Sequence, residues 1–502
     1  MEKVIFCVCA LFFTVIFCSR SIAAILPPEY SINWKNCGAI FQANEAVIKK
    51  IDLKKDFGAS GGGKTDDSEA FRRAIESAAG PAEIYVPEGE YLLRSPIVIK
   101  KDNIYLTGAG ADKTRLVFDL NGTTLNCINI CGTISSDSSK AVDGLEKGNT
   151  RIKIENSGAI EGGGFAAILQ DNDPAIMYTK PEWNQPWAKD SVGQVFGVKS
   201  VKDGFVELEE PLHITFRKEM SARLVRVNAV TGCAVSSLYV KRLDRGDSDI
   251  IHIENAANCL IDDIESELAL RSHVSISTSY KCSVKNSYFH HAYDYGGGGH
   301  GYGVELKHWT SNCLVENNIF VHLRHSMMVH QGANGNVFGY NYSKDPVATG
   351  DHDPNSLVCD ISVHGHYAFM NLFESNIVQK VEISDYWGPS GPGNTFLRNR
   401  IETEGVRIND RTSGENFIGN IIVNADYGIE PAPGAPVSGI LTQANVDYGE
   451  LGYDASIQDR EIPASLYLGE KPGFVKSVKW PLLGPDVKGT QDLPAREKAE
   501  LK

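Results

Sequence analysis

The stretch Val304-Glu305-Leu306-Lys307 alternates apolar and charged residues, and Met327-Met328-Val329-His330 repeats the pattern 23 residues later. Strict alternation directs one side chain inward and the next outward, which is typical of a β-strand. The same alternation recurs on both sides of this stretch, in residues 251–254, 274–277, 361–364, 381–384 and 406–409. The chain therefore repeats one short strand many times.

A column of Asn and Asp residues follows the same repeat. Its members lie 21 to 35 residues apart: Asp263, Asn286, Asn318, Asn341, Asn376, Asn399 and Asn420. A period of this length indicates a solenoid. Because each repeat holds at least two short strands and no helical pattern, it predicts an all-β fold, a parallel β-helix whose coils stack about 4.8 Å apart. We interpret the column as a ladder of hydrogen-bonded side chains at one turn.

Two of the repeats are longer than the others by about ten residues. The first excess is residues 293–302, with four consecutive glycines, and the second is residues 346–357. Insertions in a solenoid become loops on one face, often the binding face. We expect these two loops to flank the coils that carry Lys307 and His330.

Residues 56–78, DFGASGGGKTDDSEAFRRAIESA, resemble the opening of the pectate-lyase-like β-helix superfamily, where such a motif leads a capping helix into the first coil. Residues 82–91 and 104–110 continue the resemblance. It implies a right-handed parallel β-helix and polysaccharide cleavage, although the superfamily also includes phage tailspikes and glycosidases. The polygalacturonase motifs are missing as a set. Residues 58–65 also match the P-loop spacing, but no alternating strands and helices follow, so we expect no nucleotide site.

The chain divides into five predicted parts. Residues 1–23 have the basic start, apolar run and small-residue end of a signal peptide, with cleavage near Ala23, which predicts an extracellular or periplasmic protein. Residues 24–140 should form the N-terminal cap and first coils, 141–228 an inserted β-subdomain, and 229–430 the central β-helix with the active-site face. Residues 431–502 should cover the open edge of the last coil and end in a charged, mobile tail.

The predicted β-subdomain contains a hairpin with an Asp203-Gly204 turn. We expect this subdomain to overhang the groove of the β-helix. Its Trp183 and Trp187 fit either of two roles, stacking on sugars or packing within the subdomain.

The 502 residues carry a net charge of −14 and contain no basic tract, which disfavours nucleic-acid binding. An acidic surface still allows an acidic substrate if the site itself is basic. No later apolar run is long enough to span a membrane. Four cysteines occupy the same place in successive coils, and we expect them to form a buried column of small side chains: Cys233, Cys259, Cys282 and Cys313.

Stacking the strands places Lys307, His330 and His364 in one outward column, about 5 Å apart at the backbone. A second outward column beside it holds Glu305, Met328, Ser362 and Glu382. The turn before His330 and the first insertion bring further polar side chains to the same face: His322, Arg324, His325, His300 and Tyr302.

Such a face can carry out β-elimination at a uronic acid, which needs a cation for the carboxylate, a base for the C5 proton and an acid for the leaving oxygen. We predict that Lys307 or His330 is the base, that Arg324 holds the substrate carboxylate and that Tyr302 assists proton transfer. Clustered cations should lower the pKa values of Lys307 and His330. The residues predicted to bind the acidic polysaccharide are His300, Glu305, His322, His364 and Asp385.

Two other functions stay open. A glycoside hydrolase needs two carboxyl groups roughly 5–9.5 Å apart, and Asp360 could pair with Glu305 or with Asp385. A glycan-binding β-helix without catalysis, like a tailspike, would explain the fold but not the basic column.

Calcium is the one cofactor that the sequence allows, because Asp294, Asp351 and Asp353 could supply oxygen ligands. No Cys/His spacing predicts a zinc site. The identity of the polysaccharide and the oligomeric state are not determined by the sequence.

Overall fold

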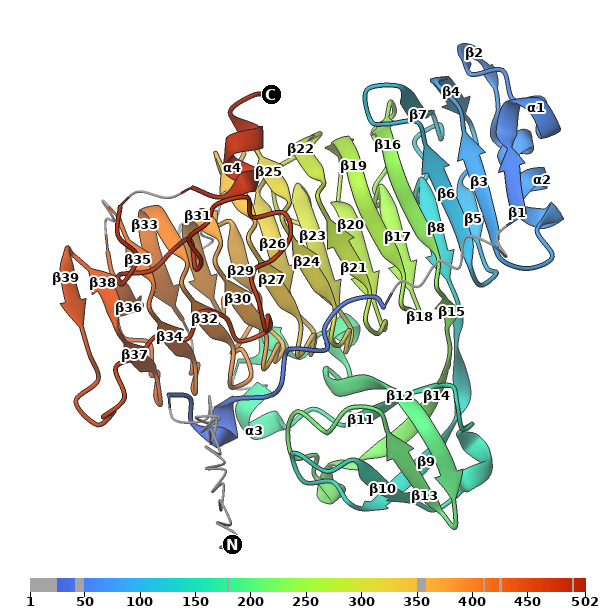
Figure 1. Ribbon diagram of the computed structural model, residues 1–502. Helices are drawn as coiled ribbons and strands as arrows, with labels where there is room; N and C mark the ends of the chain where they lie inside the picture. The colour runs from blue at the N-terminus through green and yellow to red at the C-terminus, as the bar shows by residue number, and fades with distance from the viewer. Residues whose placement is uncertain are drawn as a thin grey trace, which may run out of the picture.

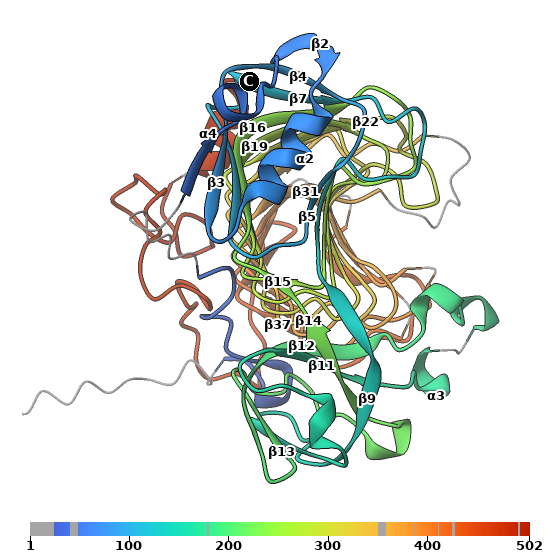
Figure 2. The same ribbon diagram turned by 90° about the vertical axis from the view of Figure 1, so that its right-hand side faces the viewer.

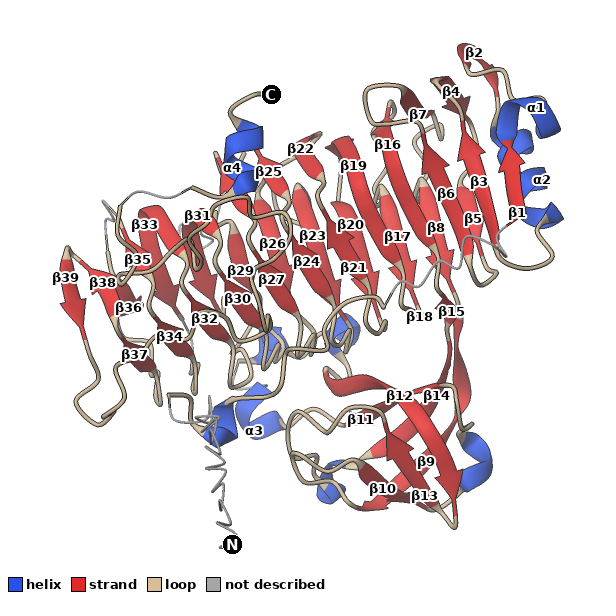
Figure 3. Cartoon of the chain, in the orientation of Figure 1, coloured by secondary structure: helices blue, strands red, loops and turns tan. Residues whose placement is uncertain are grey.

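The computed structural model describes residues 25–40, 49–177, 180–349, 358–385, 387–409, 411–423, 427–489 and 492–502. Within them the chain winds into a long parallel β-helix with a small β-barrel attached below it (Figure 1). Strands dominate and helices are few and short (Figure 3). The predicted fold class is confirmed, whereas the signal peptide predicted for residues 1–23 lies outside the described residues.

Each coil contributes strands to three parallel ladders. The first ladder joins β1 (Lys49–Asp52), β3 (Ala82–Val86), β6 (Ile104–Gly108), β16 (Ala234–Arg242), β19 (Leu260–Ala269), β21 (Ser283–Lys285), β24 (Leu314–Glu316), β27 (Val337–Gly339), β30 (Leu372–Glu374), β32 (Thr395–Leu397), β34 (Asn416–Ile418) and β37 (Leu441–Gln443). The second joins β2 (Gly62–Asp66), β4 (Gly89–Leu93), β7 (Thr114–Phe118), the ends of β16 and β19, β22 (Tyr288–Ala292), β25 (Ile319–Val321), β28 (Tyr342–Lys344), β31 (Ile377–Ile383), β33 (Arg400–Ile408), β35 (Ile421–Ile422) and β38 (Asn445–Asp447).

The third ladder carries the predicted active-site face. It joins β5 (Ile97–Ile99), β8 (Ile128–Cys131), β17 (Ile251–Glu254), β20 (Ser272–Ser277), β23 (Tyr302–Lys307), β26 (His325–Val329), β29 (Ile361–Val363), the ends of β31 and β33, and β36 (Ile429–Pro431). Outside the ladders, β15 (Val230–Thr231) pairs with β18 (Ala256–Ala257), and β39 (Glu450–Gly452) runs antiparallel to β38.

The interior of the β-helix consists of stacked identical or similar side chains. Phe338, Phe373, Phe396 and Phe417 stack face to face with ring centroids 4.9 to 5.1 Å apart. The predicted cysteine column is confirmed, since all four of its thiols are buried, and the eight cysteines of the described chain are free. Each stacked row removes apolar surface from water coil after coil, which is the main source of solenoid stability.

The Asn ladder is confirmed from Asn318 onward and is continued by Asn445. Each side-chain amide donates to the oxygen of the next at 2.9 to 3.0 Å. The prediction was wrong for Asp263 and Asn286, because Ser287 occupies the ladder position and donates its backbone N–H to Asn318 Oδ1 at 3.0 Å. Asp263 and Asn286 lie one residue earlier, at a turn position with φ of 54° and 53° that Asn and Asp tolerate.

Four α-helices are present in the described chain: α1 (Leu53–Phe57), α2 (Ser68–Ser77), α3 (Pro174–Met177) and α4 (Pro494–Ala499). The predicted capping helix is α2, which lies across the N-terminal end of the coils (Figure 2) and buries Phe71, Ala74 and Ile75 against them. None of the helices among all the described residues is long and apolar enough to cross a membrane.

The attached barrel closes from six antiparallel strands: β9 (Thr133–Asp143), β10 (Arg151–Ile154), β11 (Phe165–Gln170), β12 (Val192–Lys202), β13 (Phe205–Leu208) and β14 (Arg223–Asn228). The predicted hairpin is the β12–β13 pair, and its turn residues Asp203 and Gly204 have φ of 52° and 76°. Phe369 and Met370 of the β-helix join the barrel's apolar core, which fixes the barrel to the coils.

The C-terminal segment follows its prediction only in part. β39 pairs with β38 at the edge of the last coil. The chain from Leu466 onward instead crosses the outer face of several coils (Figure 1), where Tyr467 donates to Glu316 at 2.8 Å and Arg398 pairs with Asp486 at 2.7 Å. The tail was predicted to be mobile because it is charged, but Leu493 and Ala495 are buried, and α4 packs onto the β-helix.

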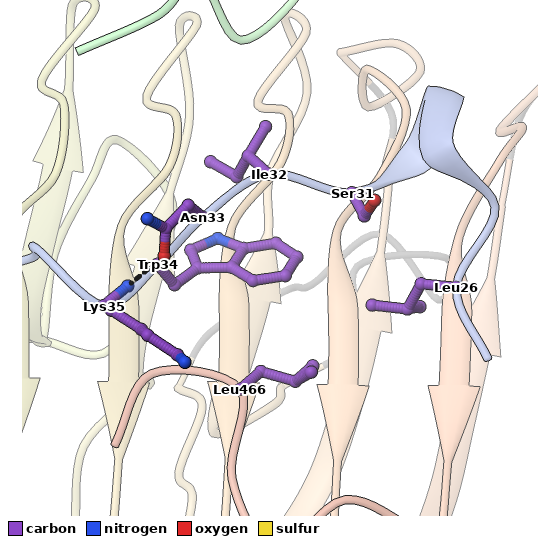
Figure 4. A pocket seen from close by; sticks show the side chains of 7 residues that line it. All are labelled: Leu26, Ser31, Ile32, Asn33, Trp34, Lys35 and Leu466. Atoms are coloured by element: carbon purple, nitrogen blue, oxygen red, sulfur yellow. Dashed lines mark hydrogen bonds between the residues drawn. The ribbon is translucent and has the colours of Figure 1, made fainter. Parts of the chain in front are cut away.

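The N-terminal segment, residues 25–40, lies on the same outer face. Trp34 Nε1 donates to the Met370 carbonyl at 2.8 Å, and Figure 4 shows Trp34, Leu26 and Leu466 around an apolar cavity of about 310 Å³. This cavity lies between two crossing segments and not on the third ladder.

Candidate active-site cleft

A cleft of about 530 Å³ opens on the outer face of the third ladder around β20, β23 and β26. Its lining is rich in basic and aromatic side chains: Trp187, Arg271, Gly297, Gly298, Gly299, Tyr302, Glu305, Lys307, His308, Arg324, Met328, His330, Gln331, His364 and Trp387. Most of the residues predicted for catalysis or binding are in this set.

The strand register produces the predicted column. Leu306 pairs with Val329 and Val329 with Val363, so the residues that follow them, Lys307, His330 and His364, lie on three successive coils. The imidazole centroids of His330 and His364 are 5.5 Å apart.

Glu305 is the buried centre of the cleft floor, with 2% of its surface exposed. Its Oε1 accepts from His330 Nε2 at 2.9 Å, and its Oε2 accepts from Lys307 Nζ at 2.7 Å and from the Ser275 and Ser272 hydroxyls at 3.0 and 3.2 Å. Burial alone would raise the pKa of Glu305, but Lys307 and His330 hold that pKa well below its usual value. Glu305 is therefore an anion that orients its two basic neighbours.

The expectation of a lowered pKa is wrong for Lys307. Burial favours the neutral amine, but the charges of Glu305 and Asp249 outweigh it and raise the pKa of Lys307. The sequence argument counted the cations of the column but not the two carboxylates packed behind them. Lys307 is consequently a permanent cation and is better suited to bind an anion than to act as a base.

His330 keeps one ring nitrogen unused. Because Nε2 donates to the ionised Glu305, the proton-accepting atom of the neutral ring is Nδ1, which is buried and has no hydrogen-bond partner among the described residues. A histidine held by a carboxylate through one nitrogen is a typical general base. Because Nδ1 is buried, His330 can take a substrate proton only after its ring turns toward the cleft.

Two arginines donate hydrogen bonds to the backbone of the Gly-rich first insertion. Arg324 Nη1 donates to the Gly296 carbonyl at 2.9 Å, and Arg271 Nη1 donates to the Gly298 carbonyl at 3.3 Å. Sequence reasoning missed Arg271, although a signal was present: Ser272 pairs with Tyr302 and Tyr302 with His325, so Arg271 and Arg324 hold the same place before their strands.

Tyr302 and His308 complete the polar lining. Burial raises the pKa of Tyr302 to about 12, so its hydroxyl is a proton donor at neutral pH. Burial and the nearby charges of His330 and Lys307 lower the pKa of His308 to about 4, which leaves that imidazole neutral.

Three predicted binding residues are not part of the cleft lining. Asp385 contacts His364 instead: the Asp385 Oδ2 atom lies 3.0 Å from His364 Nε2. His300 follows Gly299 of the lining in sequence and lies 3.6 Å from Asp294 and 3.7 Å from Asp247. His322 is directed elsewhere and contacts Asp345 at 2.6 Å.

The carboxylate pairs considered for hydrolysis do not assemble. Asp360 is fully buried and accepts hydrogen bonds from Ser343 and from the backbone N–H groups of Gln379 and Lys380. It ties two coils together and does not reach the cleft.

No cluster of three or more His, Cys, Asp or Glu side chains suited to a metal occurs in the described part of the chain. Asp351 and Asp353 of the predicted calcium site lie outside the described residues, and Asp294 pairs with Arg245 at 2.6 Å.

The family model described as rhamnogalacturonase A/epimerase, pectate lyase-like, matches residues 53–154, which hold the capping motif and the first coils. Residues 53–154 thus resemble a pectate-lyase-like family, and the described chain has the parallel β-helix fold. Among solved structures, the tailspike gp61 of Pseudomonas phage phi297 matches this β-helix with a TM-score of 0.59 and 14% identity over 80% of this chain and 70% of the tailspike, which supports the fold alone.

Two curated relatives of this β-helix protein come from Azotobacter vinelandii. Alginate lyase 7 is 44% identical over 68 residues, or 12% of this chain and 8% of the lyase. Mannuronan C5-epimerase AlgE3 is 44% identical over 95 residues, or 17% of this chain and 5% of the epimerase. The chain thus matches less than a tenth of the length of either enzyme.

Proposed function

We propose that this protein is a polysaccharide lyase that cleaves a uronic-acid-containing polysaccharide by β-elimination. The observation that carries the proposal is the charge of the cleft. Three cations, Arg271, Lys307 and Arg324, line it around a single carboxylate, Glu305, whose oxygens already accept from four protein donors. A cleft of this kind attracts a polyanion and stabilises negative charge that develops on it.

The roles follow from the protonation states. Lys307 and the arginines bind the uronate carboxylate and stabilise the enolate-like charge that forms when C5 loses its proton. His330 accepts that proton, the C5–H electrons form the C4–C5 double bond, and the C4–O bond breaks. Tyr302 donates a proton to the leaving oxygen. Glu305 orients His330 and does not touch the substrate.

A hydrolase is less well supported. Glu305 is the single carboxylate that lines the cleft in the described chain, and its low pKa makes it unsuitable as a general acid. Calcium binding by Asp294, Asp351 and Asp353 stays a prediction from the sequence alone.

The cellular location and the substrate class are proposed from the relatives and from the N-terminal sequence. The relatives named above act on alginate and mannuronan by their names, and the N-terminal residues have the composition of a signal peptide. We place the enzyme outside the cytoplasm, acting on an acidic polysaccharide, with the active-site face on coils of residues 229–430.

The test is incubation of the purified protein with alginate, polygalacturonate, hyaluronan and chondroitin. Unsaturated products that absorb in the ultraviolet support the lyase, and their loss in His330→Ala but not in the exposed control Lys202→Ala assigns them to this cleft. New reducing ends without that absorbance indicate a hydrolase. Deuterium taken from the solvent at C5 without chain cleavage indicates an epimerase, and binding without any reaction indicates a glycan-binding module.

A further inference from the structure

The barrel reaches the cleft through the connection between β11 and β12. This connection contains α3, η5 (Pro181–Trp183) and η6 (Pro186–Ala188), and Trp187 of η6 lines the cleft. In the view along the coils, α3 extends beyond the β-helix on the side where β5 lies, which is the side of the third ladder (Figure 2). An element far from the central coils in sequence therefore contributes to the cleft wall.

The connection is fixed to the coils at several points. Gln331 Nε2 donates to the Trp187 carbonyl at 2.6 Å, and His366 Nε2 donates to the Trp183 carbonyl at 2.9 Å. Trp183 is 1% exposed and packs over Gly388, where a Cβ atom would lie 3.1 Å from the Trp183 ring. Trp183 therefore packs, but against the coils and not within the subdomain as the sequence allowed, and Trp187 is held in place at the cleft.

Trp187 and Trp387 form an aromatic corner, defined here as these two rings. Their centroids are 5.4 Å apart and their planes meet at 79°, so the rings form two walls and not a stack. Trp187 is 42% exposed although it lies in a cleft. Exposed aromatic surface in a concave site marks a place for a ligand with an apolar face, and the C–H face of a pyranose ring has that character.

The surroundings of the corner differ in charge from the cation cluster. Asp385 Oδ1 accepts from the Trp387 backbone N–H at 2.9 Å, and its Oδ2 contacts His364. Burial lowers the pKa of His364 despite the Asp385 charge, and burial lowers the pKa of His366 to about 4, so both rings are neutral at pH 7. The pair of His364 and Asp385 therefore supplies a carboxylate and no cation beside the corner, which disfavours a second uronate carboxylate there. Arg324, whose charge also acts on His364, belongs to the cation cluster.

We propose that the aromatic corner of Trp187 and Trp387 is a subsite for an uncharged sugar ring next to the uronate in the cation cluster. The substrate is then a mixed polymer in which uronic acid alternates with a neutral sugar, and not a homopolymer of uronic acid. This inference rests on the proposed function, since it needs a uronate to occupy the neighbouring cation cluster, but it concerns binding and not bond cleavage.

The experiment measures binding separately from catalysis. A His330→Ala background prevents turnover, and calorimetry gives Kd for two mixed oligosaccharides, from hyaluronan and chondroitin, and for two homopolymers, oligogalacturonate and oligomannuronate. We expect a mixed oligosaccharide to bind at least about tenfold more tightly than either homopolymer, and Trp187→Ala to remove that advantage. Trp187→Phe should retain much of it. Phe205→Ala, which changes an aromatic residue on the barrel away from the cleft, should have no effect.

Each other outcome overturns the inference. Homopolymers that bind as tightly as the mixed oligosaccharides, an absence of binding by both mixed oligosaccharides, or a Trp187→Ala variant that is folded by its melting temperature and keeps wild-type preference would each do so. Selective binding without any cleavage by the wild-type protein would uphold the aromatic corner and refute the lyase, so the two proposals fail separately.

Discussion

The Glu305 carboxylate lies 2.9 Å from His330 Nε2 and 2.7 Å from Lys307 Nζ, so one buried anion holds two successive members of the basic column. The interaction crosses one β-helix step, because Glu305 and Lys307 belong to β23 and His330 follows β26. Catalytic competence of the column should therefore depend on a residue that does not itself touch substrate.

The first prediction concerns that dependence. Glu305→Gln keeps the shape of the side chain but removes its charge, so His330 loses the partner that orients it and supports its protonated form. We expect kcat to fall on the order of 10²-fold or more, within the range of general-base loss, with a smaller change in KM. The control is Glu267→Gln, which removes an ion pair with Lys241 away from the cleft. A Glu305→Gln variant with wild-type kcat would reduce Glu305 to a structural role.

The second prediction separates the two candidate bases. Since Lys307 is a permanent cation, Lys307→Arg should retain activity within about tenfold, whereas His330→Ala should lose on the order of 10²–10⁴-fold in kcat. The measurement is kcat and KM for both variants on one substrate, with Lys241→Arg as the control. Equal losses in Lys307→Arg and His330→Ala would restore Lys307 as the base.

The third prediction is a pH dependence of stability. The pKa of Glu305 is lower in the folded protein than in the unfolded chain, so its stabilisation is complete above the unfolded value of about 4.3 and is lost as pH falls through the folded pKa. The melting temperature of the wild type should therefore fall more steeply below about pH 4 than that of Glu305→Gln. Parallel curves for the two proteins would contradict this assignment.

The sequence predicted the ladders well because a solenoid repeats the same local pattern, so each strand supports the assignment of the next. The column of Lys307, His330 and His364 followed from that register alone. The protonation state of Lys307 did not follow from the register, because the burial of Glu305 and the approach of Asp249 depend on packing between coils. Trp187 was ambiguous for a related reason: its place in the cleft depends on how a distant barrel docks, and no short pattern encodes that docking.

The fourth prediction tests the ladder. Asn376 is fully buried, donates to Asn399 Oδ1 and to the Phe338 carbonyl at 2.9 Å each, and accepts from Asn341. Asn376→Ala leaves several buried groups without partners, at about 1–3 kcal/mol for each such group. We expect a loss of about 3 kcal/mol or more in the free energy of unfolding, measured by urea denaturation.

A control for the ladder is Asn121→Gly. Asn121 is exposed and lies at a turn outside the ladder, and glycine accepts its φ of 56°, so this change should cost less than about 1 kcal/mol. Similar losses in the two variants would mean that the ladder adds nothing beyond the turn itself.

The last prediction concerns the C-terminal helix, which the sequence described as a mobile tail. Leu493 is 0% exposed in the apolar cluster that α4 shares with the outer face of the coils, and Arg496 contacts Glu402 at 2.7 Å. Leu493→Ala should therefore destabilise the protein by about 2–5 kcal/mol, the usual cost for a buried leucine. Leu501→Ala, eight residues later and at a side chain that is 88% exposed, should change stability by less than about 0.5 kcal/mol. Urea denaturation of both variants decides the point: if Leu493→Ala is as stable as Leu501→Ala, α4 does not hold the coils together, and the charged tail behaves as its composition alone suggests.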